Sequence, residues 1–537
     1  MSQHGATPGE RTEQALEAAL TAPLPTLLSA LPGLPRGASL ADGAGEVAAV
    51  VVPVAALPDN GAGPRGTPQP RRGAAEAAVS FEADVTAWAE VSSVTGKAGD
   101  ILTMAAPAHR TGGAAGLPQR LIFLGVGDES VGSLRAAGAA LAKATAGLGV
   151  VRSSVVDGLP ETLQWAFVEG FLLGGYRPPR AGLGSGPKPM ASALELTGAS
   201  AEVLRRAAST AKAVRLARNL ANMPSNVKNP GWMAAQAARL AAGAGLQIRI
   251  RDEQDLAREG FGGILAVGGG SASTPRLVEL SYTPVAAGSG RHVVLVGKGI
   301  TFDTGGVSLK PREAMVPMKT DMAGAGVVLA VLAAAAELGL GHRVTGLLPL
   351  AENAIGAGAY RPGDVVTVYG GTTVEIGNTD AEGRMVLSDA LAYAVDRLDP
   401  DVLVDIATLT GAASLGLGRR HAALYSNTPE LVTAFEAAAA GSGERIWQMP
   451  LAEVQEEYGF ALESTVADIS HIASAASKVG AGSITAALFL KEFVADTPWV
   501  HLDIAGPARA DADEAEVTKG ATGYGARLLL AFLRGLS

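Results

Sequence analysis

Cysteine is absent from this sequence, which excludes disulfide bonds and zinc sites built on thiolates. Histidine is scarce, with 7 in 537 residues, and no His-Glu-x-x-His motif occurs, which disfavours a histidine-based zinc protease. No uninterrupted apolar run reaches the roughly 18–20 residues of a membrane span. The first residues lack a basic region followed by an apolar one, so we expect no signal peptide. These absences favour a cytoplasmic protein with no membrane partner.

The charge balance is acidic, with a formal net charge of −9. A chain of this sign is poorly suited to coating nucleic acid, so we regard nucleic acid as an unlikely partner. Hydrophobic residues make up 48% of the chain, which indicates a well-packed globular protein. A length of 537 residues exceeds one ordinary core, so two domains are expected.

The order of the predicted elements indicates an α/β protein. Residues 1–40 are rich in Ala, Pro and Gly, and we expect a flexible segment there. Strand-like and helical runs alternate over 41–190, which predicts an N-terminal α/β domain. Strong helix formers fill much of 191–220, the expected interdomain helix, and a second α/β domain follows over 221–537.

The most informative segment is Asn-Thr-Asp-Ala-Glu-Gly-Arg at 378–384, which lies between a strand-like run and a helical pattern. It places Asp380, Glu382 and Arg384 at alternate positions. Clustered carboxylates are costly to bury unless a cation compensates them, and an arginine is an anion clamp. The segment therefore indicates a metal site with an anion or substrate anchor beside it.

Further charged residues of the second domain lie at the ends of predicted elements. Lys298 ends one strand, Asp303 and Lys310 follow it, and Asp321 enters a helix. The carboxyl ends of strands are where open α/β sheets place their sites. Two metal ions sharing a carboxylate would relieve the repulsion among four carboxylates, and they would lower the pKa of a water between them.

Each of these residues also has an ordinary structural explanation. A lone Asp at a helix start is more often an N-cap than a ligand, and a lone lysine is usually solvated. Arg384 alone could pair with Asp389 on a helix face. Gly297-Lys298-Gly299 lacks the spacing of a phosphate-binding loop, and Gly125-Val126-Gly127 is a weak dinucleotide signal. Only the combination of motifs makes the structural explanation unlikely.

Taken together, the motifs resemble those of the cytosolic leucyl aminopeptidases, the M17 peptidases. The segment 378–384 resembles the signature of that family, and 296–306 is similar to its first metal segment. Ser308-Leu309-Lys310 and Lys319-Thr320-Asp321-Met322 match the next two segments, and 499–506 gives a further match. The resemblance covers essentially all of 215–537 and is thin before that. It implies a macro-like N-terminal α/β domain and a C-terminal α/β/α metallo-exopeptidase domain with a central mixed sheet.

The resemblance implies two divalent metal ions, Mn²⁺ or Zn²⁺, in each subunit. One would be held by Lys298, Asp303, Asp321 and Glu382, and the other by Asp303, Asp380 and Glu382. A lysine ligand must be neutral, so the metals would have to lower the pKa of Lys298 strongly.

The resemblance also implies the catalytic and substrate-binding residues. Lys310 would stabilise the oxyanion, and Arg384 would hold a bicarbonate ion that acts as general base. Substrate-binding positions would be Met318, Asn378, Thr408, Leu409 and Gly411. The implied activity is release of N-terminal amino acids from peptides with a free N-terminus, with a broad preference for Leu-like residues, by a homohexamer.

Two other functions remain open from the sequence. One is a DNA-binding or regulatory protein that keeps the aminopeptidase fold, which the acidic balance argues against. The other is binding of a nucleotide or ADP-ribose by the N-terminal domain, for which Gly125-Val126-Gly127 is the sole local support. The sequence departs from the family pattern in a Pro/Gly-rich loop at 54–74 and in the segment 464–482, which carries His471.

Overall fold

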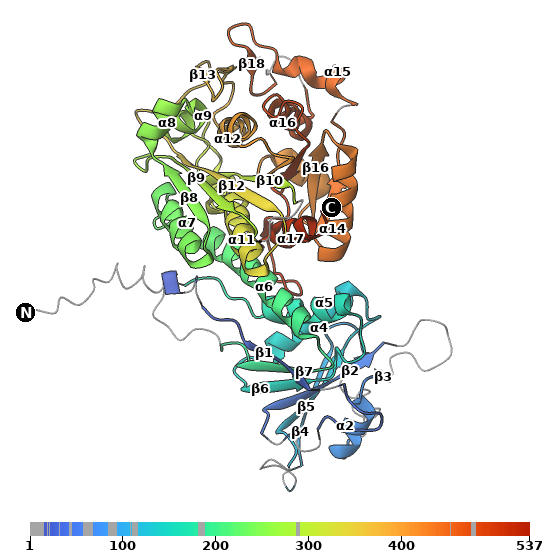
Figure 1. Ribbon diagram of the computed structural model, residues 1–537. Coiled ribbons are helices and arrows are strands. Elements are labelled where there is room, and N and C mark those ends of the chain that lie inside the picture. The colour runs from blue at the N-terminus through green and yellow to red at the C-terminus, as the bar shows by residue number, and fades with distance from the viewer. Residues whose placement is uncertain are drawn as a thin grey trace, which may run out of the picture.

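The computed structural model contains two α/β parts, one above the other in Figure 1, with the long helix α6 (Ala201–Asn222) between them. This confirms the predicted two-domain α/β fold. The structure describes residues 16–536 apart from 19, 21, 32, 42–43, 45, 57–67, 84–93, 108, 110–115, 181–187, 286–289, 452 and 474–478. Most of the Pro/Gly-rich loop and five residues of 464–482 therefore lie outside the described residues.

The N-terminal part is built on a 7-stranded sheet in the order β1-β7-β6-β2-β5-β4, with β3 pairing β2. The first five strands in this order are parallel, and β4 and β3 are antiparallel to their neighbours. The strands are β1 (Thr26–Leu31), β2 (Ala49–Ala55), β3 (Gln69–Pro70), β4 (Ile101–Ala105), β5 (Arg120–Gly125), β6 (Val150–Ser153) and β7 (Ala193–Thr197). The helices are α2 (Ala74–Ser80), α4 (Val131–Ala144) and α5 (Glu161–Gly174).

This sheet begins earlier and ends later than the predicted domain boundaries. Strand β1 lies in the segment 1–40 that we expected to be flexible, and it pairs in parallel with β7, which lies in 191–220. The expectation is wrong for 26–31 because a short strand held by a partner far along the chain has a weak local signal. The composition of the surrounding segment, rich in Pro and Gly, obscured it.

The second part contains a 9-stranded mixed sheet in the order β17-β16-β19-β15-β10-β12-β9-β8, with β11 pairing β12. Its centre, from β19 to β12, is parallel, and β9 and β8 continue it antiparallel. The strands are β8 (Gln247–Arg251), β9 (Arg276–Tyr282), β10 (His292–Gly297), β11 (Gly299–Asp303), β12 (Arg343–Asn353), β15 (Val402–Ala407), β16 (His421–Ser426), β17 (Arg445–Gln448) and β19 (Trp499–Asp503).

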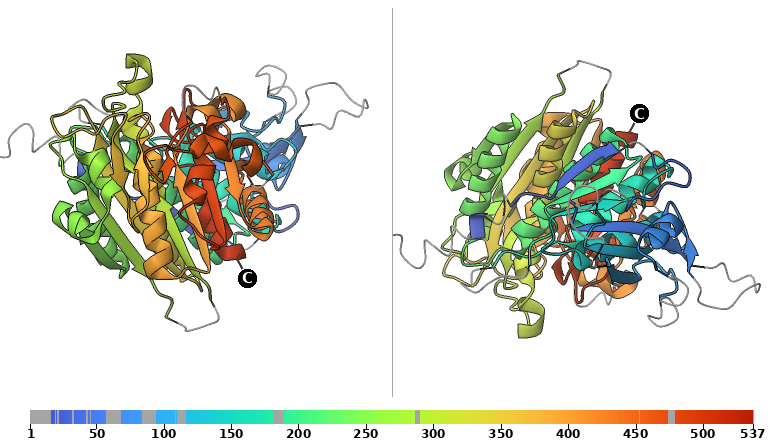
Figure 2. Two further views of the ribbon diagram at one scale, coloured as in Figure 1. Left: turned by 90° about the horizontal axis from the view of Figure 1, so that it is seen from above. Right: turned by 90° about the horizontal axis from the view of Figure 1, so that it is seen from below.

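Helices cover both faces of this sheet, as the views from above and below show (Figure 2). One face carries α7 (Pro230–Ala244), α11 (Ala323–Leu338), α14 (Pro429–Ser442) and α17 (Ala526–Gly535). The other carries α8 (Glu253–Glu259), α9 (Gly262–Gly268), α12 (Glu382–Leu398) and α16 (Gly482–Lys491). Strand β10 is buried on both sides, with Val293 and Leu295 in one core and Val294 and Val296 in the other. Such two-sided burial explains its continuous apolar sequence.

The remaining elements are short and lie mostly around the ends of the large sheet. They are α10 (Arg312–Met315), the 3₁₀ turns η2 (Met318–Thr320) and η3 (Gly459–Leu462), α13 (Gly411–Leu417), α15 (Gln455–Tyr458), the three-stranded sheet β13 (Val365–Thr367), β14 (Thr373–Glu375) and β18 (Ile469–Ser470), and the pair β20 (Arg509–Ala510) and β21 (Gly520–Ala521).

One helical stretch of the described residues, 312–338, is long and apolar enough to cross a membrane by length and composition. Within its most apolar window, 78% of the residues are buried inside the protein. Helix α11, the main part of this stretch, packs against α6 and the large sheet. Its apolar composition is therefore accounted for by the core.

Candidate metal centre

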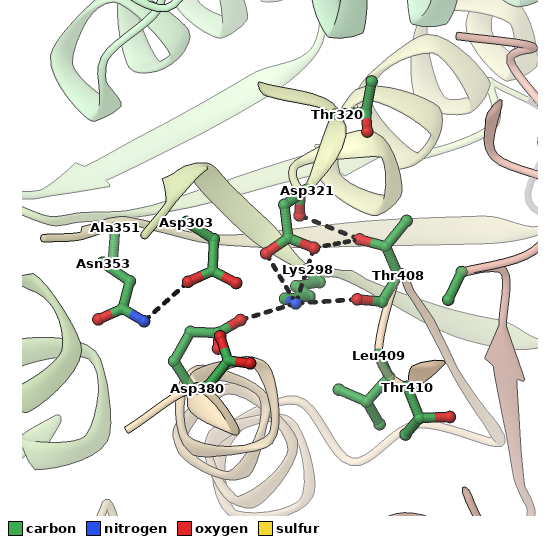
Figure 3. A network of polar contacts seen from close by, with 12 residues as sticks. Lys298, Asp303, Thr320, Asp321, Ala351, Asn353, Asp380, Thr408, Leu409 and Thr410 are labelled. Atoms are coloured by element: carbon green, nitrogen blue, oxygen red, sulfur yellow. Dashed lines mark hydrogen bonds and ion pairs between the residues drawn. The ribbon is translucent and has the colours of Figure 1, made fainter. Parts of the chain in front are cut away.

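The ends of four parallel strands of the large sheet bring polar residues to one edge. Lys298 directly follows β10, Thr408 directly follows β15, and Asp303 and Asn353 are the last residues of β11 and β12. Because parallel strands end at the same edge of a sheet, residues more than a hundred positions apart meet there. The turn η2 and the start of α12 add the remaining carboxylates (Figure 3).

Lys298 joins two of the predicted carboxylates. Its Nζ lies 2.9 Å from Asp321 Oδ1 and 2.9 Å from the carbonyl oxygen of Thr408 (Figure 3). It also lies 2.8 Å from Glu382 Oε1. The side chain is almost fully buried. The three acceptors lie directly after η2, at the start of α12 and directly after β15, so the lysine connects three segments that are distant in sequence.

Asp303 and Asp380 meet at the second lysine. Lys310 Nζ lies 2.8 Å from Asp303 Oδ2 and also contacts Asp380 Oδ1. The other oxygen of Asp303 accepts hydrogen bonds of 2.8 Å from the amide of Asn353 and 2.8 Å from the backbone N–H of Gly305. These contacts fix the plane of the Asp303 carboxylate and direct one oxygen toward the cluster.

Glu382 completes the group of carboxylates. Oxygens of Asp303, Asp380 and Glu382 all lie within 4.8 Å of one another, which is close enough for one cation to contact them together. Glu382 Oε2 is buried and accepts no hydrogen bond from any residue that the structure describes. A buried carboxylate oxygen without a donor is costly, and a divalent cation is the usual partner of such a group. The donor set therefore fits a metal site.

The electrostatics show how strongly these carboxylates oppose one another. Burial and the charge of Glu382 raise the pKa of Asp303 to about 6, against the opposing effect of Lys310. Burial also raises the pKa values of Asp321 and Asp380. Burial acts against the charge of Lys298, yet Asp321, Glu382 and Asp303 together raise the pKa of this lysine. Two ammonium groups thus leave four carboxylates incompletely neutralised, and a bound cation would relieve this repulsion.

Glycines allow these groups to approach closely. A Cβ at position 383 would lie 2.4 Å from Lys298 Cε, so any larger residue between Glu382 and Arg384 would displace the lysine. Gly305 has φ +87°, and a Cβ there would lie 2.9 Å from Asp380 Oδ1. The glycine of the 378–384 segment is therefore explained by lack of space beside Lys298.

Arg384 lies in the first turn of α12 and is buried. Its Nη1 donates a 2.5 Å hydrogen bond to the carbonyl oxygen of His471, and its Nε has no hydrogen-bond partner among the described residues. Burial lowers the pKa of this guanidinium to about 10, which leaves it charged at neutral pH. A buried cation with a free donor is suited to holding an anion.

Three of the predicted substrate-binding residues, Thr408, Leu409 and Gly411, follow the end of β15 at the same edge of the sheet. Thr408 donates a 2.6 Å hydrogen bond to Asp321, and Leu409 follows it with its N–H on Asp503. Gly411 opens α13, and a Cβ at this position would meet no described atom within 4 Å. The other two lie close in sequence to the carboxylates: Met318 is the first residue of η2, and Asn378 begins the 378–384 segment.

Two residues beside the cluster were not among the predicted site residues. The Asn353 amide donates to both Asp303 and the carbonyl oxygen of Thr379, which ties two carboxylate-bearing segments together. The carboxylate of Asp503 accepts from Leu409 N–H and Thr410 N–H and so holds the turn after β15. Asp503 could have been found from the sequence, because it lies within the matched segment 499–506. No sequence motif indicated Asn353.

Comparison with known proteins agrees with this geometry. The family model "Cytosol aminopeptidase family, catalytic domain" matches residues 215–530. A probable cytosol aminopeptidase of Geotalea uraniireducens is 42% identical over 437 residues, which cover 78% of this chain and 86% of that protein. One from Geobacter sulfurreducens is 41% identical over 78% of this chain and 85% of its own length.

Two solved structures have the same fold across both parts of the chain. The bottromycin maturation enzyme BotP in complex with Mn is 35% identical, has a TM-score of 0.77, and is matched over 91% of this chain and 99% of that one. A tomato leucine aminopeptidase variant is 27% identical, has a TM-score of 0.80, and is matched over 96% of this chain and 97% of that one. The chain belongs to the cytosol aminopeptidase family, the M17 peptidases, a family of metal-dependent enzymes that act on peptides.

Proposed function

We propose that this member of the family is a two-metal aminopeptidase that releases N-terminal residues, preferably Leu-like ones, from peptides. The observation that carries the proposal is the set of oxygens from Asp303, Asp380 and Glu382 within 4.8 Å of one another. Glu382 supports it further, because its buried Oε2 accepts no hydrogen bond from the part of the chain that is described. A solvated acidic patch would not bury a carboxylate oxygen without a donor.

The residues present divide into two ligand sets that share Asp303 and Glu382. One set adds Lys298 and Asp321, and the other adds Asp380. Divalent cations bound there supply Lewis acidity, which lowers the pKa of a water to the neutral range. Lys298 must give up its proton to act as a ligand, so we expect metal binding to release a proton and to be stronger at higher pH.

Lys310 is the group that we propose for stabilising the oxyanion. Burial acts against its charge, but Asp303 and Glu382 raise its pKa, so it remains an ammonium at neutral pH. It reaches the cluster from the side of Asp303 and Asp380. A fixed ammonium at this position can donate to the scissile carbonyl oxygen as negative charge develops on it.

Arg384 is the residue that we propose for holding a bicarbonate ion as general base. Its Nη1 is already used by the carbonyl oxygen of His471, while its Nε lacks a partner among the described residues. A guanidinium is a planar donor that matches the geometry of a three-oxygen anion. This proposal also explains how the reaction proceeds without a histidine base.

The side-chain preference follows from the turn after β15 and from η2. Thr408, Leu409, Gly411 and Met318 would line the pocket for the first side chain, and Asn378 would face it. An apolar pocket of this kind discriminates weakly, because one methylene changes binding by about 1–3 kcal/mol. We therefore expect hydrolysis of leucine and methionine substrates at similar rates.

The proposal also covers the identity of the metal, the oligomeric state and the cellular location. Oxygen ligands with one amine suit both Mn²⁺ and Zn²⁺, and we favour Mn²⁺ because the similar structure of BotP contains Mn. We propose a homohexamer, to be tested by light scattering of the purified protein. We also propose a cytoplasmic location, which the names of the relatives support.

The decisive experiment combines metal analysis with turnover of leucine, methionine and arginine anilides. We expect the purified protein to hold two metal ions and Asp380→Asn to lose both metal and activity. The matched control is Asp496→Asn, a change at an exposed carboxylate beyond α16. Wild-type metal content and hydrolysis in Asp380→Asn would reject the proposed function.

A further inference from the structure

A short strand, β18, pairs with β14 just before the 378–384 segment and is followed by a buried histidine. Strand β18 pairs in parallel with β14, with Ser470 opposite Glu375. The next residue, His471, is fully buried and donates its backbone N–H to Glu375 O at 3.2 Å. The segment 464–482, a departure from the family pattern, thus places a histidine in contact with the start of the segment that carries Asp380, Glu382 and Arg384.

The ring of His471 contacts the chain just before Asp380. Its Nε2 lies 2.9 Å from Asn378 O, and its Nδ1 lies 3.2 Å from Gly377 N and 3.1 Å from Glu375 O. Burial and the charge of Arg384 lower the pKa of the ring to about 4, so it is neutral at pH 7. A neutral ring protonated on Nε2 donates to Asn378 O and accepts from Gly377 N–H at Nδ1. In this tautomer Nδ1 does not donate to Glu375 O, which accepts instead from the backbone N–H of His471.

The backbone of the same residue holds the arginine. The carbonyl oxygen of His471 accepts from Arg384 Nη1 at 2.5 Å. The neighbouring Ile472 leaves no room for a side chain at position 377, where a Cβ would lie 2.7 Å from its Cγ1. One residue therefore contacts both the beginning of the 378–384 segment, through its ring, and the end of it, through its carbonyl group.

We propose that His471 is a positioning residue for the reaction. Its ring fixes the turn at 377–378, and its carbonyl oxygen orients the guanidinium of Arg384. Its hydrogen bonds go to Arg384 and to the chain before Asp380 rather than to the proposed metal ligands, so it acts through Arg384 and the turn. The inference rests on the proposed function, since it assumes that Arg384 holds the bicarbonate base.

Loss of the contacts that His471 makes has a specific consequence. The metal ligands keep their own contacts through Lys298, Lys310 and Asn353, so metal content should not change. The guanidinium of Arg384 would become less well oriented, so the anion site would weaken. Removal of a residue that orients a metal ligand through a hydrogen bond typically changes affinity or activity by about 10–100-fold, and we expect an effect of the same order for a residue that orients Arg384.

The test compares three variants of His471 with one matched control. His471→Leu removes both ring contacts, His471→Gln can still donate to Asn378 O, and His471→Asn can still accept from Gly377 N–H. The control is His292→Leu, since His292 is also buried and hydrogen-bonded, to Thr345, but begins β10 at the end opposite Lys298. Leucine anilide turnover is measured over a range of bicarbonate concentrations, together with metal content and melting temperature.

We expect His471→Leu to lower kcat by about 10–100-fold and to raise the bicarbonate concentration for half-maximal activity by about tenfold or more. KM and metal content should stay as in the wild type, His471→Gln and His471→Asn should each recover part of the loss, and His292→Leu should turn over normally. If His471→Leu does not fold, the Gln and Asn variants carry the same comparison.

Two results would overturn the inference: a bicarbonate dependence and kcat like those of the wild type in all folded His471 variants, or a loss of activity matched by a loss of metal. A wild-type protein without metal-dependent hydrolysis would instead reject the proposed function, so the two failures are distinguishable.

Discussion

Both parts of the molecule contain a mainly parallel sheet, but the residues at the ends of their strands differ. At the N-terminal sheet, the charges pair within the chain: Arg72 lies 2.6 Å from Glu129, and Asp157 accepts a 2.6 Å hydrogen bond from Leu34 N–H. At the large sheet, four carboxylates meet two lysines, and Glu382 Oε2 has no donor among the residues described. Similar architecture therefore does not make a site. Incomplete compensation of buried carboxylates distinguishes the edge at which we propose the metal site.

The largest expected difference comes from comparing one carboxylate at each edge, Glu382 and Asp157. Glu382→Gln keeps the size of the side chain but removes the charge shared by both ligand sets, so we expect metal binding and activity to be lost. Asp157→Asn, at the N-terminal edge, should leave metal content and kcat unchanged. Metal analysis and anilide turnover measure both. Equal losses in the two variants would contradict the contrast between the sheets.

The stability of the protein should also depend on the contact between its two parts. Arg527 is buried and lies 3.4 Å from Glu169 of α5, 3.4 Å from Glu444 and 3.2 Å from Glu516. Arg527→Met removes the cation that these carboxylates share, although Glu169 keeps Arg135 at 3.0 Å. Breaking a buried pair in this way costs about 3–5 kcal/mol. Denaturant unfolding measures the change. The matched control is Arg420→Met, because Arg420 pairs with Glu514 at the surface and should contribute less than about 1 kcal/mol.

A third prediction separates Lys310 from the metal ligands. Lys310→Ala should keep its metal but lose kcat by about 10²–10³-fold, because removal of one oxyanion donor has this effect. Lys143→Ala is the counterpart in the N-terminal part, where Lys143 donates to the backbone of Ala515, and it should retain full activity. Loss of metal from Lys310→Ala would show that this lysine has a different role.

The smallest expected effect concerns pH. Burial and Arg384 lower the pKa of His471 to about 4, below its unfolded value. The folded state therefore binds fewer protons, and stability is fully present above the unfolded pKa of about 6.5 and falls as pH drops toward 4. The shift corresponds to about 3 kcal/mol at most. Urea unfolding between pH 4 and 7 should show a steeper loss for the wild type than for His471→Gln; parallel curves would contradict this.

Local sequence patterns were sufficient to predict most of the helices and strands near the site. The apolar run ending at Gly297 predicted β10, and the helical pattern after Arg384 predicted most of α12. The carboxylates and lysines were predicted to meet because they follow strand ends, a rule that depends on sheet geometry alone. Their ligand roles remain predictions.

Contacts between distant segments could not be predicted from the sequence. Asn353 lies 50 positions from Asp303 and His471 lies 87 positions from Arg384, so no local pattern indicates either hydrogen bond. Strand β1 was missed for the same reason, since its partner β7 begins at Ala193. In each case the pairing partner is determined by the packing of the whole chain.

The sequence by itself determined the chemistry that is available: two lysines, four carboxylates and an arginine at the ends of apolar strands and before a helix, with no cysteine and no histidine motif to compete. Only the tertiary structure decided which charges compensate one another. It left Glu382 Oε2 without a donor in the described chain and placed His471 in contact with the 378–384 segment. The physical reason is that side-chain types are local, whereas burial and hydrogen-bond partners depend on segments that meet only after folding.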